Sequence, residues 1–109
     1  EYDLLPWMNM HGVPVMAYCP LAQGGDLKRG LYENRVLTSI AQSHNATVSQ
    51  ILLAFAIRSG QVIAIPRTAT PAHAAENSSA MNLVLTEDEL TQIDREYPAP
   101  TRKVGLDIV

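Results

Sequence analysis

Two short polar stretches, each directly after an apolar run, carry the residues best suited to chemistry. Arg67 and Thr68 follow the apolar residues 62–65, and Thr70-Pro71 comes shortly afterwards. An arginine guanidinium is a planar fork of donors that suits a phosphate. The N–H groups at the start of a helix opened by Thr70 form a natural anion site. On their own, Arg67 could be a solvated surface charge and Thr70 only a helix cap.

The second stretch follows Tyr18 and contains Cys19, Pro20, Leu21, Gln23 and the pair Gly24-Gly25. Glycine lets the backbone approach a ligand closely, and successive N–H groups form an anion-binding concavity. In most proteins, however, a Gly-Gly pair is an ordinary flexible turn. Tyr18 lies at the end of the strand predicted from the apolar run 13–19, so its ring is expected to project beyond the strand, with a buried core aromatic as the alternative.

Several other classes of function are disfavoured. His11, His44, His73 and the single Cys19 lack metal-ligand spacing, so we predict no metal site. Neither glycine-rich nucleotide motif, Gly-x-Gly-x-x-Gly or Gly-x-x-x-x-Gly-Lys-Ser/Thr, is present. A net charge of −3 gives no basic surface for nucleic acid or an anionic membrane. No apolar run approaches the ~20 residues of a membrane helix, and a lone cysteine fits a reducing cytoplasm.

The apolar pattern alternates between strand-like and helix-like segments. Val13–Cys19 and Val62–Ile65 are nearly unbroken apolar runs, typical of strands with both faces covered. Helices are expected at 2–10, 36–44, from Thr47 to Gly60, 70–81 and 86–97, with 20–35 as a long loop and 98–109 as a tail. Two of these helices begin with capping boxes, Thr47 with Gln50 and Thr86 with Glu89, and Leu90, Ile93 and Tyr97 of the last are expected to face inward.

Such βαβα alternation predicts parallel strands joined by right-handed crossovers. Two parallel strands leave two open edges and too little sheet to cover the helices. The 109 residues are also far fewer than the roughly 250 of a full (β/α)8 barrel. The chain is therefore expected to be part of something larger.

Three segments resemble aldo-keto reductases. Ile65-Pro66-Arg67-Thr68, with Thr70-Pro71 and Glu76-Asn77 after it, resembles the family's cofactor signature Ile-Pro-Lys-Ser/Thr, Asn/Thr-Pro and Glu-Asn. Ala-Tyr-Cys-Pro-Leu at 17–21 is similar to the usual Ala-Tyr-Ser-Pro-Leu, and 85–90 is similar to Leu-Thr-x-Glu-Glu-Leu. The matches keep the family's order and spacing over nearly the whole chain, and details resemble bacterial members of the methylglyoxal-reductase type.

The resemblance implies that residues 1–109 are the C-terminal portion of a (β/α)8 TIM barrel, an α/β fold, with NADP(H) at the C-terminal ends of strands 13–19 and 62–65. Tyr18 would stack under the nicotinamide, and the loop after it would meet the pyrophosphate. Arg67 and Thr68 would hold the 2′-phosphate. The residues implied in cofactor binding are Tyr18, Cys19, Pro20, Leu21, Gln23, Gly24, Arg67, Thr68, Ala69, Thr70, His73, Glu76 and Asn77.

Two positions depart from the family's pattern. Cys19 replaces the usual serine, which keeps a small side chain but loses a hydroxyl contact. His73 stands where many members have an arginine that grips the 2′-phosphate, and a neutral histidine supplies no fixed charge near pH 7. NADH therefore stays open beside NADPH.

None of the residues that catalyse reduction in the family has a match, so we expect no catalytic residue here. Three hypotheses follow. The chain is part of an NADP(H)-dependent reductase of small aldehydes or ketones, a non-catalytic cofactor-binding module, or a truncated product that self-associates through its open strand edges. In the first, the rest of the barrel covers those edges.

Overall fold

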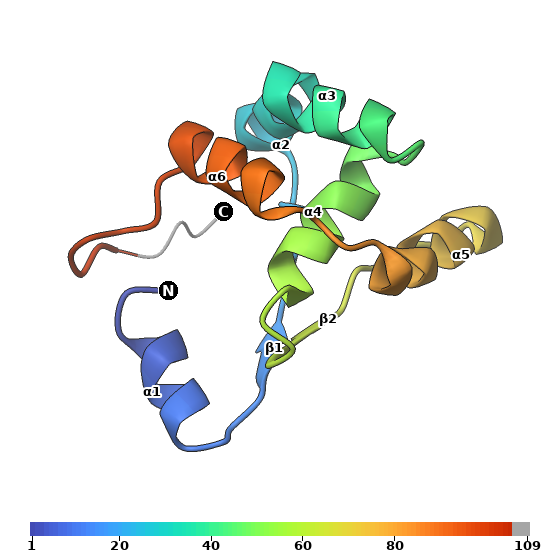
Figure 1. The fold of residues 1–109 in the computed structure, drawn as a ribbon. Helices are drawn as coiled ribbons and strands as arrows, with labels where there is room; N and C mark the ends of the chain where they lie inside the picture. Colours follow the sequence, from blue (N-terminus) through green and yellow to red (C-terminus); the bar gives the residue numbers. More distant parts are fainter. Residues whose placement is uncertain (106–109) are drawn as a thin grey trace.

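The computed structural model describes residues 1–105, which form several helices and a short two-stranded sheet at the edge of the helical body (Figure 1). The elements, in chain order, are α1 Leu4–Met10, β1 Val15–Ala17, α2 Gly25–Glu33, α3 Arg35–Ser43, α4 Val48–Ile57, β2 Val62–Ala64, α5 Pro71–Ser79, the 3-10 helix η1 Ala80–Asn82 and α6 Glu87–Glu96. The predicted tail is irregular from Pro98 to Gly105, and its residues 106–109 lie outside the described part.

The two strands pair in parallel, as the sequence pattern predicts. Val15 lies opposite Val62 and Ala17 opposite Ala64. Both strands are shorter than the predicted 13–19 and 62–65, because regular pairing is confined to this register. Pro14 has no N–H to donate before it, and the backbone turns away soon after Ala17.

The prediction that residues 20–35 form a loop is wrong, because α2 occupies Gly25–Glu33. Gly24 and Gly25 mark the start of this helix, with Asp26 in its first turn, where a carboxylate is favourable. Gly30 inside the helix costs about 1 kcal/mol relative to alanine. Packing against α3 and a hydrogen bond of 2.6 Å between the hydroxyls of Tyr32 and Ser49 offset that cost.

The buried core lies between helices rather than at the sheet. Leu37, Ile40 and Ala41 of α3 meet Ile51 of α4 and Ile93 of α6. These positions recur at helical spacing, and the prediction that Ile93 faces inward is confirmed. The same prediction for Tyr97 is wrong: this residue follows α6 and is 39% exposed.

Both predicted capping boxes are present. The side chains of Thr47 and Thr86 each accept a hydrogen bond from the backbone N–H of the residue three positions on, and the side chains of Gln50 and Glu89 accept one from the backbone N–H of the cap residue. Thr70 does precede α5, but its side chain makes no capping hydrogen bond. The hydroxyl of Thr68 instead accepts from the Thr70 backbone N–H at 3.1 Å.

One face of the sheet is open in this chain. Val15, Ala17, Val62 and Ala64 are half-buried on the face that α4 adjoins. Between them, on the opposite face, Met16 and Ile63 are 64% and 51% exposed. Figure 1 shows α1 set apart from the helical body, beyond the start of β1. Among residues 1–105, no helix has the length and apolar character to cross a membrane.

An ion pair joins the end of α3 to the start of α6. The His44 ring lies 2.8 Å from the Glu89 carboxylate, and both side chains are largely buried. Burial raises the pKa of Glu89, but hydrogen bonds from His44 and from Thr86, with the charge of His44, bring it below its ordinary 4.5. The folded state therefore favours the ionised carboxylate.

We expect Leu37→Ala to lower the free energy of unfolding by about 2–5 kcal/mol, because it leaves a cavity in the helical core. Leu4→Ala is the matched control, since Leu4 is 61% exposed, and should change it by less than about 0.5 kcal/mol. Urea unfolding followed by circular dichroism measures both. Equal losses would contradict the assignment of the core to α3, α4 and α6.

The Glu89 contact predicts a dependence of stability on pH. A carboxyl group with a lowered pKa in the folded state stabilises above its unfolded value, near 4.5, and loses this contribution as the pH falls through the folded value. Glu89→Gln keeps a capping side chain, as Gln50 shows in α4, but removes the charge. We expect a weaker loss of stability below pH 4.5 in this variant than in the parent.

Urea titrations at several pH values test this expectation. Glu87→Gln, in the same first turn but exposed, is the control and should keep the parent's pH dependence. An unchanged profile in Glu89→Gln would show that the pair with His44 contributes nothing to folding.

Candidate functional site

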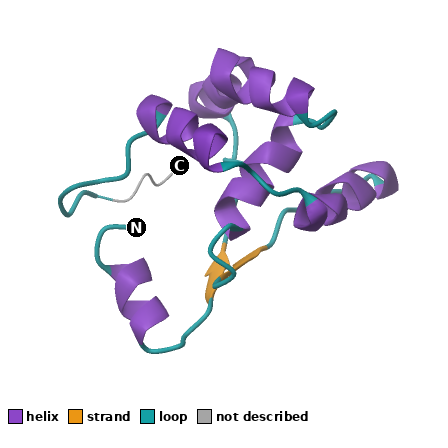
Figure 2. Ribbon diagram, viewed as in Figure 1, coloured by secondary structure: helices purple, strands orange, loops and turns teal. Residues whose placement is uncertain are grey.

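The polar stretches singled out in the sequence begin at the same end of the sheet. Because Ala17 lies opposite Ala64, Tyr18 and Ile65 leave the paired region side by side, and the Ile65 N–H donates to the Ala17 carbonyl at 3.2 Å. In Figure 2 the loops after both strands lead away from this end toward α2 and α5. Parallel pairing thus brings together two segments almost 50 residues apart in sequence.

Tyr18 is the most accessible aromatic side chain near this end, at 75% exposure. The alternative that it is a buried core residue is therefore wrong for this chain. Its hydroxyl accepts a hydrogen bond of 2.7 Å from the Gln23 amide. The hydrogen bond and charge of Cys19 raise the pKa of Tyr18 above its ordinary 10.0, whereas donation from Gln23 lowers it.

The loop after Tyr18 is a tight reversal. Cys19 and Ala22 both have positive φ, 51° and 59°, a region that non-glycine residues rarely adopt. The Ala22 N–H donates to the Cys19 carbonyl and closes the turn at 3.1 Å. Cys19 keeps a polar contact despite replacing a serine, since its sulfur accepts from Gln23 at 3.1 Å.

The segment after β2 presents the remaining predicted residues on an open surface. Arg67, Thr68, Ala69, Thr70, His73 and Glu76 are all exposed, and Asn77 is half-buried. Thr68 tightens the turn before α5 through its hydrogen bond with the Thr70 backbone. The first N–H groups of α5 have no side-chain cap.

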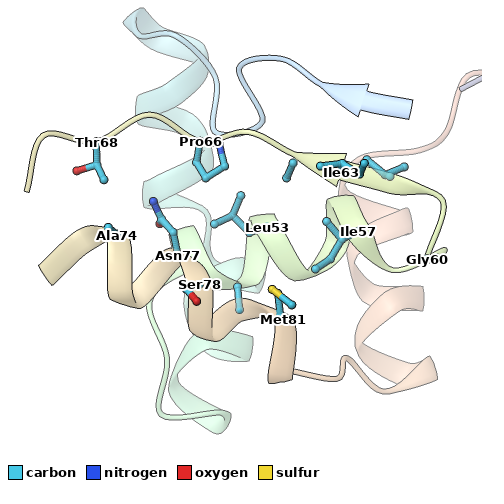
Figure 3. A pocket seen from close by; sticks show the side chains of 13 residues that line it. Leu53, Ile57, Gly60, Ile63, Pro66, Thr68, Ala74, Asn77, Ser78 and Met81 are labelled. Atoms are coloured by element: carbon cyan, nitrogen blue, oxygen red, sulfur yellow. The ribbon is translucent and has the colours of Figure 1, made fainter. Parts of the chain in front are cut away.

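A pocket of about 610 Å³ lies between β2, α4 and the α5–η1 segment (Figure 3). Thr68 and Asn77 line one end, and in Figure 3 the Asn77 amide extends toward Pro66. The other end is apolar, with Ile57 and Met81 on its walls. Of the predicted residues, Thr68 and Asn77 belong to this pocket, whereas Tyr18, Cys19 and Gln23 form a separate cluster of contacts.

Sequence reasoning missed part of this pocket. Ala74, Asn77, Ser78 and Met81 line it together because they recur at three- and four-residue spacing along α5 and into η1. This spacing is visible in the sequence. However, apolar and polar residues are only weakly segregated around the helix, so the sequence does not indicate which face of it lines a pocket. Among residues 1–105, no three His, Cys, Asp or Glu side chains come close enough together to hold a metal ion.

Comparison with known proteins decides the family. Residues 1–97 match the sequence profile of the aldo/keto reductase family. The chain belongs to this family. It is 48% identical over its whole length to methylglyoxal reductase YeaE of Escherichia coli K12, and 33% identical over 93 residues to methylglyoxal reductase DkgA of the same organism.

The fold of this aldo/keto reductase chain also matches a solved relative. A crystal structure of an aldo/keto reductase from Klebsiella pneumoniae, in complex with NADP and acetate, superposes on 99% of the chain with a TM-score of 0.92 and 49% identity. The prediction of an α/β fold that forms part of a TIM barrel is confirmed. The chain spans 38% of the length of that protein and of YeaE, and 32% of DkgA.

The positive φ of Ala22 yields a test of the loop geometry. Ala22→Gly should raise the free energy of unfolding by up to about 1 kcal/mol, because glycine adopts this conformation without the Cβ clash. Ala75→Gly, in the exposed middle of α5, should lower it by about 1 kcal/mol. Thermal and urea unfolding of both variants measure the difference. Destabilisation by both would contradict the left-handed turn at Ala22.

Proposed function

We propose that this chain is part of an NADP(H)-dependent aldo/keto reductase that reduces small aldehydes or ketones to alcohols, and that it supplies a share of the cofactor surface. The observation behind the proposal is the emergence of Tyr18 and the Arg67–Asn77 segment from neighbouring C-terminal strand ends. Barrel enzymes build their active sites at these ends. The Klebsiella relative, similar over almost the whole chain, was crystallised with NADP.

The cluster around Tyr18 suits the nicotinamide half of a dinucleotide. A flat, exposed aromatic ring fixes the plane of a stacked ligand without committing hydrogen bonds to it. The loop Cys19–Gly24, which includes Pro20 and Leu21, follows directly and would offer backbone N–H groups to the pyrophosphate.

The segment after β2 suits the adenosine half. Arg67 and Thr68 are exposed and offer a guanidinium and a hydroxyl to a 2′-phosphate. The backbone around Ala69 and Thr70 leads into the uncapped start of α5, which favours an anion. His73 lies on the first turn of α5. Glu76 and Asn77 follow one turn further along the helix and provide polar groups for the adenine.

The bound dinucleotide would supply the hydride, and the carbonyl oxygen must also receive a proton. The chain's residues in this proposal bind and orient the cofactor, and the general acid belongs to another part of the protein. Tyr32 is no substitute, because its hydroxyl is bonded to Ser49 between α2 and α4.

We propose that the rest of a barrel covers the open sheet face and the outer edge of β2. In the observed register, Gln61, Ile63 and Ile65 direct their backbone groups toward β1, which leaves those of Val62 and Ala64 on the outer edge. Both residues also line the apolar pocket, so an added strand would find partners for its backbone and side chains. That the chain spans 38% of its relatives' length favours this occupant over a second copy.

Methylglyoxal is a reasonable first substrate to assay on the complete protein, because YeaE and DkgA are named for its reduction. We propose a reducing cytoplasm as the compartment, since Cys19 is the single cysteine.

Replacing Arg67 tests the adenosine half of the proposal. Arg67→Met should weaken NADPH binding about 10- to 100-fold, because a hydrogen bond to a charged group contributes about 1.5–3 kcal/mol. NADH lacks the 2′-phosphate, so its affinity should change less than about 2-fold. Arg95, exposed on α6, provides the control, because Arg95→Met removes the same charge away from the site.

Calorimetric titration of the parent chain and both variants with each cofactor gives these affinities. Equal losses for NADPH and NADH would remove Arg67 from the 2′-phosphate site. No binding of NADPH to the parent chain would reject its role as a cofactor-binding unit by itself.

A further inference from the structure

The side chain of Gln23 turns back onto the two residues at the end of β1. Its amide nitrogen lies 2.7 Å from the Tyr18 hydroxyl oxygen and 3.1 Å from the Cys19 sulfur. A side-chain amide has two N–H groups, so it can donate to both acceptors at once. One exposed residue thereby links the polar end of an exposed aromatic ring to the side chain of the next residue.

This contact exists because of the unusual backbone between the two residues. An extended run from residue 18 to residue 23 would separate them by roughly 16 Å. The left-handed conformations of Cys19 and Ala22, and the turn hydrogen bond between them, reverse the chain instead. Such conformations are unfavourable for non-glycine residues, and they cluster at functional sites.

We propose that Gln23 is a positioning residue, whose side chain holds the Tyr18 ring in the plane needed to stack on the nicotinamide. This inference rests on the proposed function and adds to it a role for a side chain that lies beyond the stacking surface itself. Without the hydrogen bond from Gln23, the Tyr18 ring, which is 75% exposed, can rotate about its side-chain bonds. Cofactor binding would then have to fix the orientation of the ring. Immobilising such a side chain opposes association, and a hydrogen bond made before binding removes this cost.

Two ligands separate this role from a general effect on the fold. NADPH carries a nicotinamide, whereas 2′,5′-ADP carries only the adenosine end with its phosphates. Gln23→Leu removes both donors with little change in size. It should weaken NADPH binding about 3- to 10-fold, the value of one ordinary hydrogen bond, and leave 2′,5′-ADP unchanged. Gln42→Leu, an exposed glutamine of α3, should alter neither affinity.

The state of the Tyr18 phenol gives a second readout that needs no ligand. A donor to the phenol oxygen stabilises the phenolate, so its loss in Gln23→Leu should raise the pKa of Tyr18 further. Nuclear magnetic resonance titration of the chain with ¹³C-labelled tyrosine measures this pKa, and Tyr18→Phe assigns the signal.

Each outcome decides between the two claims. Weaker NADPH binding, unchanged 2′,5′-ADP binding and a raised Tyr18 pKa support the positioning role. Equal losses for both ligands, or an unmoved Tyr18 pKa, overturn it while the proposed function stands. If the parent chain binds neither ligand, it is not a cofactor-binding unit by itself, and the positioning role is overturned for this chain.

Discussion

The parallel pairing of β1 with β2 is the constraint on which the rest of the structure depends. Its register places Ala17 opposite Ala64, so the residues that follow start from adjacent points. A shift of one residue would send Tyr18 to the other face of the sheet, because strand side chains alternate with a period of two. The Tyr18 loop and the Arg67 segment therefore start side by side only in the observed register.

Packing between helices is the main interaction that holds the two strands in register. The buried core joins α3, α4 and α6, and α4 leads through Gly60 directly into β2. The sheet itself contributes little burial, since Met16 and Ile63 are exposed on its open face. A packed helical body that carries two unfinished strands is the arrangement expected for a portion of a barrel, whose remaining strands would complete the sheet.

Features with a local cause were predictable from sequence, and features with a distant cause were not. The boxes at Thr47 and Thr86 follow from residues three positions apart, and the strands follow from unbroken apolar runs. Helix α2 was missed because Gly24, Gly25 and Gly30 suggested a loop, whereas packing on α3 decides its conformation. His44 and Glu89 are 45 residues apart, and no sequence pattern pairs them.

In the candidate site, too, some features were predictable from sequence and others were not. Family resemblance selected the Tyr18 and Arg67 segments, and the structure brings their starting points together. The contact from Gln23 depends on positive φ at Cys19 and Ala22, which residue types alone do not reveal. Thr70 shows the converse: a residue suited to capping stands at the cap position, yet its side chain makes no capping hydrogen bond, and its own N–H donates to the Thr68 hydroxyl.

The central claim is that two adjacent strand ends receive one dinucleotide. Backbone amide resonances of the ¹⁵N-labelled chain, followed during titration with NADPH, test it most directly. The account predicts that signals from Tyr18–Gly24 and from Arg67–Asn77 shift together with a single binding constant. Shifts confined to one of these segments, or centred on α1 or α6, would contradict it.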